Sequence, residues 1–199
     1  MRILVVGASG TIGRAVTAAL EPRHEVITAG RESGDVRVDI ASQDSIRAAY
    51  EQVGALDAVV CAAGKVTWAH FDDLRPKDYL VGLENKLMGQ VNLVLLGRDV
   101  VRERGSFTLT TGVLDRDPIP EGVSASMVNG GVNAFVMAAS ICLPRQQRIN
   151  VVSPGLIEES VPAIGSFFPG ADTIAAADAA RAYVKSVEGA QTGQVYEVP

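Results

Sequence analysis

The chain has 199 residues, of which 47% are hydrophobic and 21% are charged, and its formal net charge is −5. This balance excludes a disordered chain, and the length predicts a single domain over residues 1–199. No basic tract and no long apolar run occurs, so we expect neither nucleic acid nor a membrane as a partner. Two isolated cysteines, Cys61 and Cys142, indicate a cytoplasmic protein without a metal site.

Short apolar, β-branched runs alternate along the chain with longer stretches of helical periodicity. The predicted strands are Ile3–Val6, Glu25–Ala29, Val36–Asp39, Leu56–Cys61, Ser106–Thr110, Arg148–Val152 and Gln194–Val198. The predicted helices are Ile12–Leu20, Asp44–Val53, Pro76–Arg104, Ser124–Leu143 and Thr173–Val187. This alternation predicts a doubly wound α/β fold with a sheet of about seven mostly parallel strands.

The connection between the second and third predicted strands contains only Gly30 to Asp35. Parallel strands ordinarily need a crossover of about a dozen residues. A few extended residues nevertheless reach roughly 16 Å, which is enough to return along a strand of about four residues. We therefore expect the third strand to be short, to lie at the edge of the sheet, and to have no helix in its crossover.

A glycine-rich turn joins the first predicted strand directly to the first predicted helix. Its candidate binding residues are Gly7, Ser9, Gly10, Thr11, Ile12 and Gly13. Glycine permits a positive φ and a close approach of a pyrophosphate, while the helix N–H groups and dipole face the anion. A tight turn without a ligand is the alternative, but its place in the first strand–turn–helix unit favours nucleotide binding.

The end of the second predicted strand indicates which nucleotide is bound. NAD-selective folds place a carboxylate there, whereas Gly30 offers none and Arg31 suits a 2′-phosphate. Ser33 could add a hydroxyl, and Asp39 could accept a hydrogen bond from the adenine amino group. The alternatives are a solvated Arg31 and an Asp39 that caps a turn or helix. The pattern predicts NADP in preference to NAD.

These motifs resemble those of the short-chain dehydrogenase/reductase family over nearly the whole chain. Ala62, Ala63 and Gly64 lie in a segment similar to the family's Asn-Asn-Ala-Gly motif, and Ser153-Pro154-Gly155 resembles the segment that holds the nicotinamide carboxamide. The resemblance implies that Ala62, Ala63, Gly64, Pro154 and Gly155 also contact the cofactor. It further implies a Rossmann-type domain, a small carbonyl or alcohol substrate, and a homodimer or homotetramer.

The segments that carry the family's catalytic residues depart from the family pattern. The family reduces carbonyls with a Tyr-x-x-x-Lys pair, a serine and an asparagine. The resemblance places Ala125 at the tyrosine, Asn129 at the lysine and Thr111 in the serine region. It places Lys86 at the asparagine, with the preceding Asn85 as a weaker alternative.

Lys86 and Thr111 are therefore the candidate catalytic residues. A lysine in a dry cleft can donate a proton or stabilise an oxyanion, and a threonine can hydrogen-bond a carbonyl oxygen. The alternatives are a helix-surface lysine and an ordinary strand-end threonine. Two functions stay open: an NADP-dependent oxidoreductase with an altered catalytic set, and a non-catalytic NADP(H)-binding sensor or scaffold.

Overall fold

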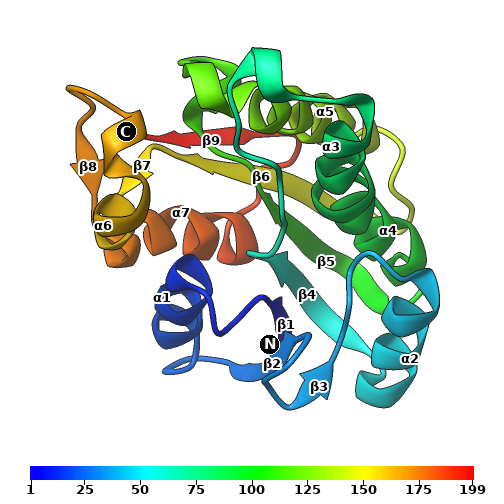
Figure 1. Cartoon of the computed structure of the whole chain (residues 1–199). Helices are drawn as coiled ribbons and strands as arrows, with labels where there is room; N and C mark the ends of the chain where they lie inside the picture. The colour runs from blue at the N-terminus through cyan, green and yellow to red at the C-terminus, as the bar shows by residue number, and fades with distance from the viewer.

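The apolar strands pair into one parallel sheet that separates two layers of helices (Figure 1). The computed structural model describes residues 1–199, and its seven-stranded sheet has the order β3-β2-β1-β4-β5-β6-β9. The strands are β1 (Arg2–Val6), β2 (Glu25–Gly30), β3 (Val36–Arg37), β4 (Leu56–Cys61), β5 (Val101–Thr110), β6 (Arg148–Pro154) and β9 (Val195–Val198). Every pairing is parallel, so the predicted fold class is confirmed.

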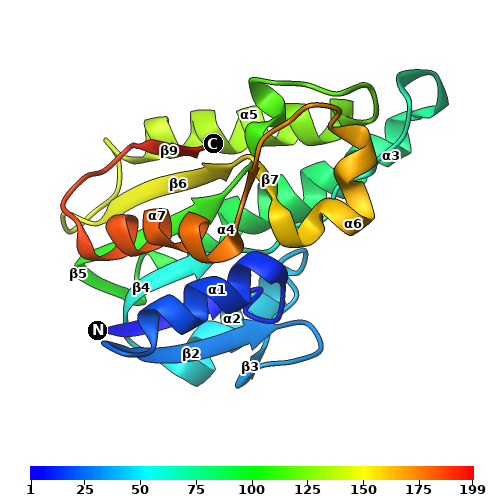
Figure 2. The same cartoon turned by 90° about the vertical axis from the view of Figure 1, so that its left-hand side faces the viewer.

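Helices cover both faces of the sheet (Figure 2). The helices α1 (Thr11–Leu20) and α7 (Ala176–Glu188) pack on one face over a cluster of 11 buried apolar residues. The helices α2 (Gln43–Val53), α4 (Met88–Gly97) and α5 (Val123–Ala139) pack on the other face over a cluster of 22. Because both faces are covered, the strands are apolar at consecutive positions. No helix combines the length and the hydropathy that crossing a bilayer requires.

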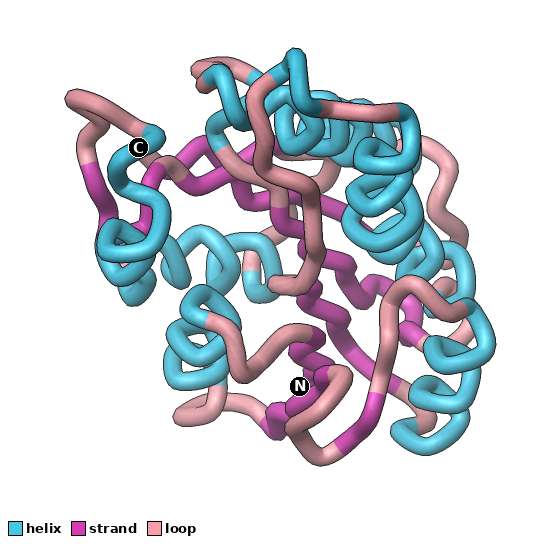
Figure 3. The backbone as a smooth tube through the Cα atoms, viewed as in Figure 1, coloured by secondary structure: helices cyan, strands magenta, loops and turns pink.

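The connection between β2 and β3 contains no helix, as predicted (Figure 3). Strand β3 lies at the edge of the sheet and contains only Val36 and Arg37, so the predicted strand to Asp39 was too long. The Asp35 carboxylate accepts hydrogen bonds from the Thr28 backbone N–H and hydroxyl at 2.9 and 2.8 Å. These two bonds lower the pKa of Asp35 and hold the short connection against β2.

The predicted helix Pro76–Arg104 is divided into several elements. It contains α3 (Pro76–Val81), a π-helical turn over Gly82–Leu87, and α4, after which Val101 already begins β5. The prediction failed at the last residues because β-branched Val101 pairs with Leu56 of β4.

The other helix ends also differ from the prediction. Helix α5 ends at Ala139, and α7 begins at Ala176 instead of Thr173. The segment β8 (Thr173–Ile174) pairs instead with β7 (Leu156–Ile157) in a two-stranded sheet.

Short helical turns fill the loops that follow the carboxyl ends of the strands (Figure 2). They comprise Phe71–Asp73, Val113–Asp115, Pro120–Gly122, Glu158–Ser160, α6 (Val161–Ile164) and Gly165–Phe167. This edge of a parallel sheet is where ligands bind in α/β proteins.

Both helical layers hold the carboxyl end of β5 in place. The buried Gln90 amide of α4 exchanges two hydrogen bonds of 2.8 Å with the Thr110 backbone. From the other layer, the Tyr183 hydroxyl lies 2.7 Å from Thr110 Oγ1, which donates to the Cys61 carbonyl at 2.6 Å. Since the single Thr110 proton goes to Cys61, Tyr183 is the donor to Thr110. These hydrogen bonds therefore fix the position of Thr110, and with it the start of the loop that follows β5.

Replacing Tyr183 with phenylalanine tests this link between α7 and β5. We expect Tyr183→Phe to lower the free energy of unfolding by about 1 kcal/mol, because a buried hydrogen bond is lost. Tyr196→Phe is the control, since its hydroxyl bonds to Gln191 in an exposed position. Urea unfolding of both variants measures the difference, and equal effects would contradict the stabilising role of the buried bond.

Candidate functional site

The turn between β1 and α1 is shaped for a close backbone approach. Gly7 has a φ of 84°, and a Cβ on it would lie 2.8 Å from the Ala62 carbonyl oxygen. A Cβ on Gly13 would overlap the Gly7 carbonyl group, so α1 can start only where this residue is glycine. Gly10 supplies no side chain to cap α1, which leaves the N–H groups of the first turn directed at a ligand.

A groove of about 360 Å³ runs along this turn and the ends of β2 and β4. It brings together eight predicted cofactor residues: Gly7, Ser9, Gly10, Arg31, Asp39, Ala62, Ala63 and Gly64. Lys65 and Asn85 also line it. Thr11, Gly13 and Ser33 lie outside the lining, and Ile12, Pro154 and Gly155 line a second cavity instead.

Within the groove, Arg31 is exposed and Asp39 is half-buried. The Arg31 side chain is 69% exposed and lies 3.3 Å from Glu32. Asp39 Oδ1 accepts from the Ala41 backbone N–H at 3.0 Å, which is the turn-capping alternative foreseen for it. One oxygen of Asp39 is therefore already used within the chain.

The second cavity has a volume of about 160 Å³ and lies beside the groove. Most of its lining is apolar, including Ile12, Val66, Trp68, Val113, Leu114, Ala125, Leu156, Ile157, Ile164 and Phe168. The polar side chains in its lining are those of Lys86, Thr111, Asn129 and Ser160. A Cβ on Gly64 would lie 2.6 Å from Lys86 Cγ, so the Lys86 stem lies between groove and cavity.

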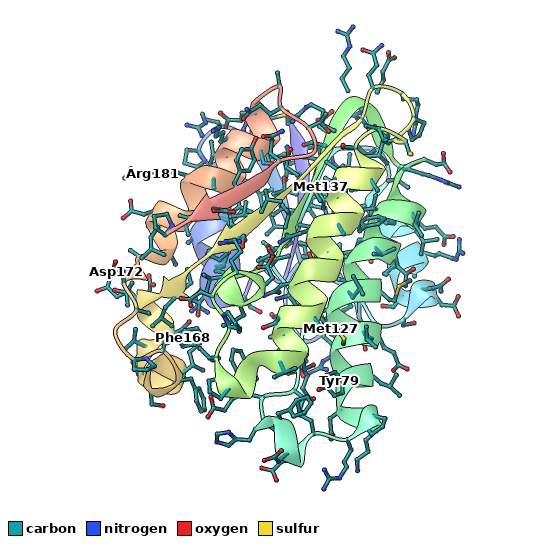
Figure 4. All side chains as sticks on the ribbon, turned by 90° about the horizontal axis from the view of Figure 1, so that it is seen from above. Tyr79, Met127, Met137, Phe168, Asp172 and Arg181 are labelled. Carbon is teal, nitrogen blue, oxygen red and sulfur yellow. The ribbon has the colours of Figure 1, made fainter.

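Loops from two parts of the chain meet over the second cavity. The ring of Trp68, from the loop after β4, stacks on Phe167 at a centroid distance of 6.2 Å. The neighbouring Phe168 lies beside α6 (Figure 4) and also lines the cavity. These aromatic rings add apolar surface around the polar groups of the cavity.

Asn85 and Lys86 are adjacent in the π-helical turn Gly82–Leu87, but their side chains line different cavities. Asn85 Oδ1 accepts from the Lys65 backbone N–H at 2.7 Å and belongs to the groove. Lys86 lies in the second cavity. π-Helical turns often occur at functional sites, and local sequence patterns do not predict them.

The Lys86 side chain is half-buried, and its ammonium is hydrogen-bonded. Its Nζ donates to Asn129 Oδ1 at 2.8 Å and approaches the Thr111 carbonyl oxygen at 3.4 Å. Asn129 Nδ2 donates to the Gly112 carbonyl at 3.1 Å, which fixes the amide with its oxygen toward Lys86. An ammonium has three donors, so one N–H of Lys86 stays available to a ligand.

Burial lowers the pKa of Lys86 to about 8, and the negative charge of the nearby Asp115 opposes this shift. Relative to the family pattern given above, Lys86 and Asn129 exchange side-chain types between their two positions. The positive charge is thus kept while its point of attachment changes, and the buried Ala125 adds only a methyl group to the cavity.

Two further polar residues lie behind Thr111, and sequence reasoning did not identify them. Thr111 Oγ1 bonds to Asn133 Oδ1 at 3.1 Å, and Asn133 Nδ2 donates to Asp115 Oδ2 at 2.6 Å. Neither residue belongs to a motif, so no sequence signal pointed to them. The structure contains no cluster of His, Cys, Asp and Glu side chains that could hold a metal ion.

The family model described as enoyl-(acyl carrier protein) reductase matches residues 7–196. The chain belongs to the short-chain dehydrogenase/reductase family. Its oxidoreductase character and its nicotinamide nucleotide site follow from this membership.

Individual relatives agree with this assignment. The chain is similar to the crystal structure of the protein lin1944 from Listeria innocua, with 53% identity, a TM-score of 0.99 and complete coverage of both chains. It is similar to a small-chain dehydrogenase solved in complex with NADPH, with 25% identity and a TM-score of 0.88 over 100% of this chain and 96% of that one. It is 25% identical to versicolorin reductase of Emericella nidulans over 180 residues, which are 78% of this chain and 68% of that protein.

The lowered pKa of Lys86 predicts a pH-dependent stability. Its pKa of about 8 lies below the ordinary 10.5, so the unfolded state binds more protons between these two values. The stability of the unaltered protein therefore rises with pH across that window. We expect Lys86→Met to be more stable at pH 7 by up to about 3 kcal/mol, with the advantage shrinking toward pH 10.5.

Chemical unfolding across this pH range measures the effect. Lys77→Met, which removes an exposed lysine of α3, is the control and should show no such trend. A constant difference between Lys86→Met and the unaltered protein would contradict the lowered pKa.

Proposed function

We propose that the protein is an NADP-dependent oxidoreductase that acts on a small carbonyl or alcohol, with Lys86 as its proton donor. The observation that carries the proposal is the free N–H of a half-buried ammonium in a largely apolar cavity next to the nucleotide groove. Ala125 stands where the family has its tyrosine, so Lys86 is the cavity group able to supply a proton.

The chemistry follows from this placement. NADPH supplies a hydride when it is bound. The free N–H of Lys86 donates to the carbonyl oxygen of the substrate, and the apolar lining strengthens this bond by excluding water. As negative charge develops on that oxygen, Lys86 transfers its proton, for which its pKa of about 8 is well matched near neutral pH. In the reverse direction, neutral Lys86 accepts the hydroxyl proton.

The second candidate function is a non-catalytic NADP(H)-binding sensor or scaffold. It is favoured by Ala125 and Asn129, which replace the family's Tyr-x-x-x-Lys pair. The two functions predict the same nucleotide binding and differ only in turnover.

The first test replaces Lys86. We expect Lys86→Met to lower kcat/KM for carbonyl reduction at least about a hundredfold, because the proton donor is lost. NADPH affinity should change much less than turnover, since eight of the predicted cofactor residues line the groove, while Ile12, Pro154 and Gly155 share the cavity with Lys86. Steady-state kinetics and calorimetry measure the two quantities, with Lys77→Met as the control. Equal turnover in both variants would exclude Lys86 as donor, and NADPH binding without turnover in the unaltered protein would favour the sensor.

The preference for NADP is also part of the proposal. Gly30 and Arg31 line the groove without any carboxylate of β2 to meet a ribose 2′-hydroxyl. The exposed Arg31 guanidinium is free to move from Glu32 to a 2′-phosphate. Support comes from the similar small-chain dehydrogenase, which was solved with NADPH.

We expect NADPH to bind at least about tenfold more tightly than NADH, because a charge-assisted bond contributes roughly 1.5–3 kcal/mol. Arg31→Ala should remove most of this difference. Arg37→Ala is the control, since Arg37 is exposed on β3 but bonds to the Gly34 carbonyl outside the groove. Calorimetric titration with both nucleotides measures the ratio of the two affinities. Equal affinities for NADPH and NADH in the unaltered protein would contradict the proposed preference for NADP.

We further propose that the protein forms a homodimer or homotetramer through the outer faces of α4 and α5. Four large apolar side chains are exposed on these helices, Met88, Leu95, Met127 and Met137, and Ile141 is exposed just after α5. Met127 and Met137 are spaced along α5 (Figure 4). A cavity of about 250 Å³, lined by Leu95 and Phe135 among others, lies between the two helices. Contiguous apolar surface of this kind marks protein interfaces.

The double change Leu95→Glu with Met137→Glu should yield monomers, because charges would be buried in the interface. Sedimentation velocity measures the assembly state. Phe71→Glu, at an exposed apolar residue of the turn Phe71–Asp73 outside α4 and α5, should leave assembly unchanged. Monomers in the unaltered protein at micromolar concentration would refute the proposal.

A further inference from the structure

The Asp115 carboxylate fixes the direction of the hydrogen bonds that join it, through Asn133, to Thr111. Asp115 Oδ2 accepts from Asn133 Nδ2 at 2.6 Å, and a carboxylate can only accept. Arg116 Nη1 lies 3.6 Å from Asp115 Oδ1, in keeping with a charged Asp115. The nitrogen of the Asn133 amide must therefore face Asp115, and its oxygen must face Thr111.

This orientation of the Asn133 amide determines where the hydroxyl proton of Thr111 lies. Asn133 Oδ1 cannot donate, so the Thr111 hydroxyl donates to it across 3.1 Å. What Thr111 Oγ1 retains is a lone pair, and Thr111 lines the second cavity. Thr111 is therefore a hydrogen-bond acceptor toward a ligand, whereas the sequence predicted that it donates to a carbonyl oxygen.

A hydrogen-bond donor, the Lys86 ammonium, lies close to the Thr111 backbone. Lys86 Nζ is 3.4 Å from the Thr111 carbonyl oxygen, and its third N–H is a donor. The remaining lining is largely apolar, so a ligand group that faces Thr111 without a proton leaves a buried acceptor unpaired. The cavity thus offers Lys86 as a donor and Thr111 as an acceptor, and Ser160 and Trp68 also line it.

We propose that Asp115, acting through Asn133, makes Thr111 an acceptor and so selects substrates with a hydroxyl beside the reacting carbon, namely α-hydroxy carbonyls and vicinal diols. The carbonyl or reacting hydroxyl oxygen of such a compound accepts from Lys86, and its neighbouring hydroxyl donates to Thr111. A simple ketone pairs only with Lys86. This substrate class rests on the proposed function, but the polarity of Thr111 does not. Asp115 and Asn133 are positioning residues, since neither lines the cavity.

The test uses two probes of matched size, hydroxyacetone and 2-butanone, which differ by a hydroxyl in place of a methyl group. Their affinities for the nucleotide-free protein are measured by NMR titration. We expect Thr111→Val to shift the affinity ratio by about fivefold toward 2-butanone, the effect of one hydrogen bond, while Thr111→Ser keeps the ratio. An unchanged ratio in Thr111→Val would overturn the proposal.

Asp115→Asn tests the direction of the bonds. An amide at position 115 can donate to Asn133, which frees the Asn133 amide to turn and releases the Thr111 proton. We expect this variant to shift the ratio toward 2-butanone by a similar factor, and to have no further effect in the Thr111→Val background. A merely structural role would lower both affinities equally, and that result would contradict the proposal.

Neutron diffraction of the unaltered, deuterium-exchanged protein decides the matter even where Asp115→Asn fails to fold. The Thr111 deuteron should lie between Oγ1 and Asn133 Oδ1, and a deuteron directed into the cavity would overturn the inference. These measurements need neither nucleotide nor turnover. A shifted ratio without any NADPH binding would therefore refute the proposed function alone, and Lys86-dependent turnover with a constant ratio would refute this inference alone.

Discussion

The position of the candidate site depends on the paired hydrogen bonds between the Gln90 amide and the Thr110 backbone, which fix the carboxyl end of β5. A strand end that projects from a sheet has unpaired backbone groups, and burying them without partners is costly. Gln90 satisfies those of Thr110 from α4, and Tyr183 engages its hydroxyl from α7. The next residues, Thr111 and Gly112, then present their carbonyl oxygens to Lys86 and Asn129. Rigid placement of these acceptors makes the position of a mobile lysine side chain reproducible.

The electrostatics of the cavity depend on one cation, the half-buried Lys86 ammonium. Burial raises the pKa of the Cys61 thiol to about 12, so this thiol stays neutral and does not pair with Lys86. Asp115 is the carboxylate whose charge favours the protonated lysine, and it is held at the far end of the Thr111–Asn133 chain. The same carboxylate therefore influences both polar groups of the cavity, one through its charge and the other through hydrogen-bond direction.

Much of the fold and the nucleotide groove could be predicted, because both depend on local patterns. Runs such as Leu56–Cys61 and the Gly7–Gly13 turn carry their conformation in neighbouring residues. Prediction failed where tertiary pairing overrode local preference, as at Val101, which reads as a helix end but pairs with Leu56. It also overextended the third strand, since Asp39 caps a turn and does not continue the edge.

The sequence by itself determined the alternation of strands and helices, the glycine turn, and the unusual residue types at positions 86, 111, 125 and 129. Only the tertiary structure decided what these side chains do. The π-helical turn rotates Lys86 into the cavity, where it meets Asn129, a residue 43 positions later. Thr111 and Asp115 are joined through Asn133 on a separate helix. Such contacts depend on helix rotation and packing between distant segments, which local residue patterns do not encode.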